Sequence, residues 1–193
     1  MPQLKSIEPE FDGAWRFQTP ATIFDHLRIA MVREFPRFRG DYLYNYGDRY
    51  IQLGGGRKHI RGWDDWDYPE WNAETDSIPE KDNSITGIVT YHMLDHISPN
   101  AVRHVLLECA RVLRDEGTLT VIVPHYMGEL AHSCIDHKTQ FGIDSWRNVL
   151  GNKHDPTQDD NGIELTLGFN MIMGLSEANL VLVTQFVRTP RHG

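Results

Sequence analysis

Cysteine is scarce in this sequence, and only Cys109 and Cys134 are present among 193 residues. Their spacing matches neither a disulfide framework nor a thiolate zinc site, so no metal site is predicted and a reducing compartment is expected. The sequence also lacks an N-terminal signal-type segment and any apolar run long enough to cross a bilayer. We therefore predict a cytoplasmic protein without a membrane partner.

Basic residues are fewer than acidic residues and are scattered along the sequence. The chain has 19 Lys and Arg against 27 Asp and Glu, which gives a formal net charge of −8. No basic patch is evident that would follow a polyphosphate backbone, so nucleic acid is excluded as a main partner. A hydrophobic content of 40% is typical of a folded domain. We expect one domain, with an irregular arm over residues 1–18, a core over residues 50–125 and a variable part over residues 126–193.

Two long helices are predicted from capping residues and apolar spacing. Thr19 and Pro20 are a helix cap and a first helical residue, and the 3.6-residue period continues to residue 35. Ser98 and Pro99 have the same roles for a second helix. Its apolar stripe consists of Val102, Val105, Leu106, Cys109, Val112 and Leu113.

Apolar, β-branched runs predict strands at residues 50–53, 85–90, 118–124 and 180–187. A shorter strand ends at Asp67, and Asp144 is a candidate cap for a short helix through residue 150. Residues 163–179 fit a helix, or a strand followed by a helix, and we favour a helix for residues 171–180. This alternation predicts an α/β sandwich with a largely parallel sheet.

Residues 50–68 have the composition of half a nucleoside-binding site. They read YIQLGGGRKHIRGWDDWDY, a strand followed by three glycines, a basic turn and a second short strand. Glycines after a strand let a ligand approach the backbone closely. An acid at the tip of the next strand, here Asp67, can accept hydrogen bonds from ribose hydroxyls.

Residues 50–125 resemble the class I S-adenosylmethionine-dependent methyltransferases, in particular a branch with LNLGxG and GWxNxD in its first motif. IQLGGG and GWDDWD match that motif. SIPEKDNSITGIVTYHMLDHI and LLECARVLRDEGTLTVIVP are similar to two later segments of the branch, in the same order. The resemblance implies a Rossmann-like, doubly wound α/β fold with a mostly parallel sheet, and S-adenosylmethionine as cofactor.

The resemblance also implies roles for individual residues. Gly54 and Gly56 would lie against the methionine part of the cofactor, and Asp67 would bind the ribose. Asp76 would contact the adenine amino group, with Ile78 on the ring. Tyr91 and His92 would border the sulfonium. The full implied cofactor set is Gly54, Gly55, Gly56, Asp67, Asp76, Ser77, Ile78, Tyr91 and His92.

Methyl transfer needs a general base only if the acceptor must lose a proton. His92 and His125 are the candidates, because an imidazole titrates near neutral pH and both follow predicted strands. The acidic net charge of the chain, and its resemblance to this branch of the methyltransferases, suggest a small-molecule or sugar-containing acceptor. The alternative is a degenerate relative that binds the cofactor or a protein partner without turnover. It is favoured by the connection between the first two strands, only residues 54–61, where a parallel crossover normally takes a dozen or more.

The histidines permit a third, weaker interpretation as a metal-dependent hydrolase. His92 and His96 are four residues apart, but Met93 stands where the zinc-protease signature has Glu. His125, His132 and His137 follow no recognised ligand spacing, so a polar loop is the better interpretation of that segment.

Overall fold

The structure is a computed structural model that describes residues 49–56, 63–151, 162–174 and 179–190. The predicted arm over residues 1–18, the predicted helix over residues 19–35 and most of the connection after the first strand lie outside these ranges. None of the described helices combines the length and the apolar character that crossing a membrane would require.

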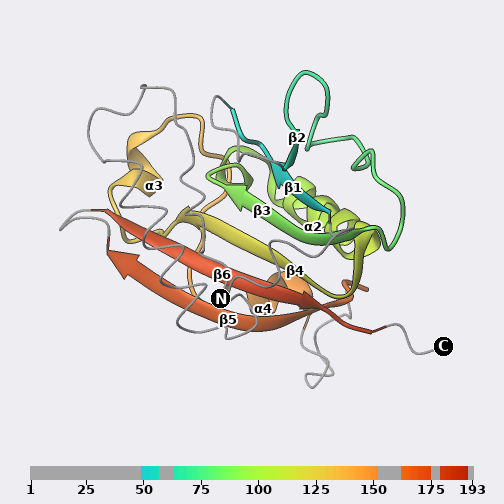
Figure 1. The fold of residues 1–193 in the computed structure, drawn as a ribbon. Coiled ribbons are helices and arrows are strands. Elements are labelled where there is room, and N and C mark those ends of the chain that lie inside the picture. The colour runs from blue at the N-terminus through green and yellow to red at the C-terminus, as the bar shows by residue number, and fades with distance from the viewer. Residues whose placement is uncertain (1–48, 57–62, 152–161, 175–178, 191–193) are drawn as a thin grey trace, which may run out of the picture.

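A six-stranded sheet has the order β2-β1-β3-β4-β6-β5. Its strands are β1 (Tyr50–Leu53), β2 (Asp64–Trp66), β3 (Ile85–Tyr91), β4 (Leu113–Pro124), β5 (Leu165–Gly174) and β6 (Leu180–Arg188). Strand β1 pairs in parallel with β2 and β3, and β3 with β4, whereas β6 is antiparallel to β4 and β5. All strands except β6 therefore run the same way, and the predicted Rossmann-like α/β fold is confirmed (Figure 1).

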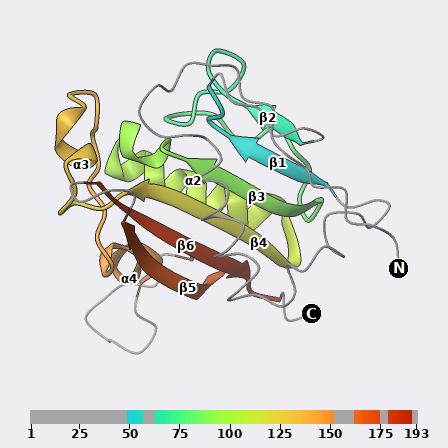
Figure 2. The ribbon, with the colours of Figure 1, turned by 60° about the vertical axis from the view of Figure 1, so that its left-hand side comes forward.

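Helix α2 (Pro99–Val112) connects β3 to β4 and covers one face of the sheet (Figure 2). Pro99 occupies its first turn, and the Ser98 side chain accepts a hydrogen bond from the Ala101 N–H, as the capping pattern predicts. The predicted stripe faces the sheet and is fully buried; Leu106 and Cys109, for example, have no exposed surface. Burying such a side chain contributes about 1.5–3 kcal/mol relative to leaving it in water.

The remaining helical segments are short. They are η2 (Leu94–His96), α3 (Leu130–Ser133) and α4 (Ser145–Leu150). Helix α4 begins after Asp144 as predicted, and its Trp146 stacks on Phe141 and meets Phe186 of β6 edge-on, with ring centroids 5.0 and 5.2 Å apart. These rings extend the apolar core beyond α2.

Residues 171–174 correct the sequence prediction of a helix, because they form the end of strand β5. They pair with β6 in a regular antiparallel register from Met171 opposite Val183 to Gly174 opposite Leu180. Pairing with a neighbouring strand thus decides the conformation of a segment whose glycines and methionines carry little local preference.

Two arginines fasten loops and strand ends to helix α2. Arg111 donates to the carbonyl oxygens of Ile78 and Glu80 and pairs with Glu108 and Asp82. Arg188, whose side chain is 1% exposed, donates to the Ala110 carbonyl at 2.6 Å and pairs with Glu164. Arg188 thereby satisfies one of the last carbonyl oxygens of α2, whereas Arg111 satisfies carbonyl oxygens of the segment before β3.

Replacing the helix cap should destabilise the domain measurably. Ser98→Ala removes the acceptor for the Ala101 N–H and the hydroxyl bond to Glu74, so we expect a loss of about 1–2 kcal/mol in the free energy of unfolding. Urea denaturation followed by circular dichroism measures it. Asn100→Ala, on the exposed side of the same first turn, is the control and should change stability by less than about 0.5 kcal/mol. Equal losses for both variants would contradict the capping role.

Candidate functional site

The turn after β1 is held by a main-chain bond and a close approach. Gly54 has a φ of +70°, and its N–H donates to the Trp66 carbonyl at 2.9 Å, which joins the ends of β1 and β2. A Cβ at this position would overlap the side chain of Met93. Only glycine therefore satisfies both the backbone conformation and the packing.

The other two glycines also use their N–H groups within the protein. Gly55 donates to the Asp65 carboxylate at 3.3 Å, and Gly56 donates to the Asp67 carboxylate at 2.6 Å. All three glycine N–H groups are thus directed to acceptors on β2 or just after it. The sequence predicted that these donors would face a ligand, whereas the structure leaves the turn without free glycine donors and flanked by two carboxylates.

Asp67 stands at the carboxyl end of β2, where the sequence predicted it. Besides Gly56, its carboxylate accepts the Tyr68 N–H at 2.8 Å. A carboxylate has about four lone-pair sites, so two of them stay available for hydroxyl donors. The side chain is half-buried, which fixes its direction while keeping it accessible.

Asp76, Ser77 and Ile78 lie on a segment that packs along α2. Asp76 is exposed, and its carboxylate accepts the Asn72 N–H at 2.9 Å and the Thr75 hydroxyl at 2.8 Å. These bonds, the one from Asn72 first, hold the pKa of Asp76 below its usual range. Ile78 is 1% exposed and belongs to the core, and Ser77 between them is exposed. Of these three residues, Asp76 and Ser77 are therefore the ones whose exposed side chains can contact a ligand.

Tyr91 is the last residue of β3, a central strand of the sheet, and His92 follows it directly. His92 has a φ of +51°, an uncommon conformation for a residue with a side chain, and its N–H donates to the Ile122 carbonyl at 2.8 Å. Its ring lies 4.4 Å from that of Tyr91. Burial, and secondarily the charge of Asp95, raise the pKa of the Tyr91 phenol, so it stays protonated at neutral pH.

His125 follows β4 but is buried, with 2% of its surface exposed. Its Nδ1 accepts the Met127 N–H at 3.3 Å, and burial lowers its pKa. The two predicted general bases therefore differ in overall exposure: the His92 residue is half-exposed, although its Nε2 is buried, whereas His125 is enclosed.

The structure also groups residues that sequence patterns missed. Asp95 and His96 of η2 meet Cys134 and His137, which follow α3. Their spacing in the sequence is too wide for a recognisable motif. The adjacent Asp95 and His96 were the available signal in the sequence.

Comparison with known proteins supports the fold and the cofactor half. Residues 56–121 match a family model described as a methyltransferase domain. The class I methyltransferase resemblance predicted from the sequence is thereby confirmed, and no curated protein matches the chain.

Several solved methyltransferases share the fold at low sequence identity. One chain comes from the complex of the Haloferax volcanii Trm112 methyltransferase activator with a putative methyltransferase; its TM-score is 0.56 at 14% identity, covering 90% of this chain and 97% of that one. A S-adenosylmethionine-dependent methyltransferase from Archaeoglobus fulgidus gives 0.53 at 11%, covering 85% and 94%. The Burkholderia thailandensis 1,6-didemethyltoxoflavin-N1-methyltransferase gives 0.50 at 14%, covering 94% of both chains.

The glycine turn of the methyltransferase core provides a matched pair of substitutions. Gly54→Ala combines left-handed backbone strain with overlap on Met93, and we expect it to cost about 2–5 kcal/mol of stability. Gly56→Ala has a φ of +60° but open space at the Cβ position, so only strain of about 1–2 kcal/mol is expected. Chemical denaturation of both variants tests the difference. A larger loss of stability for Gly56→Ala than for Gly54→Ala would contradict the packing of Met93 against the turn.

Proposed function

We propose that this protein is a S-adenosylmethionine-dependent methyltransferase that acts on a small-molecule or sugar-containing acceptor. The observation that carries the proposal is the glycine turn, whose N–H groups are all used internally and whose neighbours are the carboxylates of Asp65 and Asp67. A dinucleotide pyrophosphate requires free N–H donors at such a turn. A ligand with a sulfonium, an ammonium and ribose hydroxyls carries positive charge and hydrogen-bond donors. Both are complementary to the carboxylates that surround this turn.

The residues present fit this cofactor. Gly56 gives close approach to its methionine part, because a Cβ at this position would meet nothing. At Gly54 and Gly55 the corresponding space is filled by the side chains of Met93 and of Gln52 and Asp65. Asp67 has accepting capacity left for the ribose hydroxyls. Tyr91 and His92 offer ring faces that attract a cationic sulfonium. When bound, the cofactor supplies a methyl group on a positively charged sulfur, already activated for displacement.

The adenine end is assigned to the segment along α2. Asp76 is exposed, keeps its negative charge and has lone pairs beyond those used by Asn72 and Thr75, so it can accept from the adenine amino group. Ser77 adds an exposed hydroxyl beside it. Ile78 contributes by anchoring this segment: its N–H donates to Glu108 of α2 at 2.8 Å.

His92 is the stronger candidate for a general base. It is half-exposed at the carboxyl edge of the sheet, and its left-handed backbone is a strained feature of the kind that clusters at functional sites. His125 would have to leave its enclosed position before it could meet an acceptor. His92 would hold the proton that an acceptor hydroxyl or amine loses.

Two observations favour a small acceptor. The net charge of −8 opposes association with nucleic acid. The Burkholderia enzyme, which shares the fold, holds a small molecule, 1,6-didemethyltoxoflavin, together with S-adenosylhomocysteine.

Calorimetric titration with S-adenosylhomocysteine tests the cofactor assignment. The protein should bind it and should not bind NAD, because the turn offers no donors to a pyrophosphate. Asp67→Ala should weaken binding by more than tenfold, since a charge-assisted hydrogen bond of about 1.5–3 kcal/mol is lost. Asp64→Ala, three residues earlier and 57% exposed, is the matched control and should leave the affinity unchanged.

Absence of binding at millimolar S-adenosylhomocysteine would refute the enzyme proposal. An unaltered affinity of Asp67→Ala, with its fold intact by circular dichroism, would refute the ribose assignment alone. Binding without transfer of labelled methyl to any metabolite, peptide or RNA fraction would favour the non-catalytic alternative.

His92→Asn tests the general base on whichever small-molecule fraction accepts labelled methyl. Asparagine tolerates the left-handed backbone, so the fold should persist. We expect kcat to fall by about 10²–10⁴-fold while the affinity for S-adenosylhomocysteine changes little. An undiminished kcat across the pH range would show that the acceptor needs no base at this position.

A further inference from the structure

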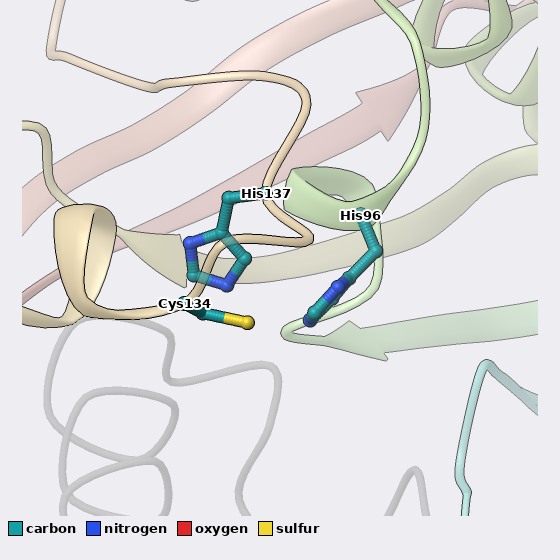
Figure 3. Close-up of side chains that lie close together, drawn as sticks. All are labelled: His96, Cys134 and His137. Carbon is teal, nitrogen blue, oxygen red and sulfur yellow. The ribbon is translucent and has the colours of Figure 1, made fainter.

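A second group of chemically active side chains lies beyond the carboxyl ends of β3 and β4, apart from the glycine turn. One ligand-type atom each of His96, Cys134 and His137 lies within 4.8 Å of the other two. Figure 3 shows the Cys134 sulfur and the His96 ring on the same side of the His137 ring. The Asp95 Oδ2 joins them, 2.9 Å from the Nε2 of His137 and 3.7 Å from the Nε2 of His96.

The orientation of His137 is set by the main chain behind it. Its Nδ1 lies 3.3 Å from the Ala131 carbonyl, which can only accept a hydrogen bond, so Nδ1 carries a hydrogen. The Nε2 is then the nitrogen that faces the cluster. Histidines that bind metals are commonly held in this way, with the second ring nitrogen donating to a carbonyl or carboxylate.

Asp95 is an unusual residue to find at this place. It is 1% exposed, and neither carboxylate oxygen makes a hydrogen bond of acceptable geometry. A buried carboxylate without donors is costly unless a cation lies against it. The Nε2 of His137 and the Oδ2 of Asp95 lie 2.9 Å apart, so either a proton or a metal cation must lie between these two atoms.

The segment that carries His137 is already fixed against η2. The N–H groups of Lys138 and Thr139 donate to the Asp95 carbonyl at 2.8 and 3.2 Å, and the Thr139 hydroxyl donates to the Ile97 carbonyl at 2.7 Å. The Lys138 ammonium pairs with Glu74 at 2.8 Å. Two segments distant in sequence are thus held in a defined register, which reduces the entropic cost of assembling a site between them.

We propose that His96, Cys134 and His137, with the Asp95 carboxylate beside the two histidines, form a binding site for one divalent transition-metal ion of the zinc class. Two imidazoles, a thiolate and a carboxylate are the donors such ions take, in tetrahedral geometry. In that geometry neighbouring donor atoms lie about 3.3–3.8 Å apart. The distance of 3.7 Å from Asp95 to His96 falls in this range, whereas the distance of 2.9 Å to His137 is shorter, so Asp95 and His137 would have to move apart if both bound the ion. The ion would fasten η2 to the segment after α3.

The site is independent of the proposed methyl transfer, so its test uses no cofactor. The full-length protein is purified without a histidine tag, stripped with a chelator, dialysed and titrated with Co²⁺ and then Zn²⁺. We expect one equivalent of Co²⁺ to give the thiolate-to-metal absorption of a tetrahedral site, displaced by Zn²⁺. A hundredfold excess of Zn²⁺ over its Kd should raise the melting temperature by about 5–10 °C.

Cys134→Ser and His137→Asn should each weaken metal binding by at least about tenfold, and Cys134→Ser should abolish the thiolate band. His132→Asn, an exposed histidine on the same segment outside the cluster, is the matched control and should bind normally. Cys134 is only half-buried, so its serine variant keeps the fold testable. Stoichiometric binding that none of the cluster variants weakens would overturn the proposal. So would absence of both the thiolate band and the thermal shift, in favour of a His137 imidazolium paired with Asp95.

Discussion

The turn after β1 depends on the close approach of Gly54 to Met93. The left-handed backbone of Gly54 directs its N–H to the end of β2, and the missing Cβ lets the Met93 side chain pack directly beneath the turn. The ends of three parallel strands are thereby brought to one edge. Met93 itself belongs to the segment that leads from β3 through η2 into α2. A single van der Waals contact therefore links the glycine turn to the helix that organises the core.

The short connection between β1 and β2 has an electrostatic consequence. A longer crossover would carry a helix, whose N-terminus provides free N–H donors and a partial positive charge for an anion. In the described part of this turn, the N–H groups are bound to β2 and the nearest charged groups are carboxylates. The same backbone motif that elsewhere favours a phosphate would here suit a ligand that carries positive charge. Shortening the crossover therefore changes the charge of the ligand that the turn would favour. It does not by itself imply a loss of ligand binding.

Predictability differed between elements for physical reasons. The helix after Ser98 was predictable because its cap and its apolar period are local properties of the sequence, and the early strands because their β-branched runs are bounded by turn residues. The end of β5 was not, since its conformation depends on pairing with β6, which no local pattern encodes. In the candidate site, Gly54 and Asp67 could be located at strand ends, but the partners of their polar groups are main-chain groups that only the folded turn brings within reach. Cys134 had no interpretable spacing because its neighbours Asp95 and His96 come from a distant segment.

Residues 91–96 connect the two sites physically. His92 keeps a left-handed backbone through its bond to Ile122, Met93 supports the glycine turn, and Asp95 and His96 reach the cluster with His137. Met93, Leu94 and Asp95 in the middle of this stretch are buried, so we expect a shift at one end to be felt at the other. A cation that fixes η2 would therefore also fix Met93 beneath Gly54 and the His92 ring beside the proposed sulfonium position. Such coupling stabilises the cofactor half without contact with the ligand, because it reduces the conformational freedom that binding would otherwise have to remove.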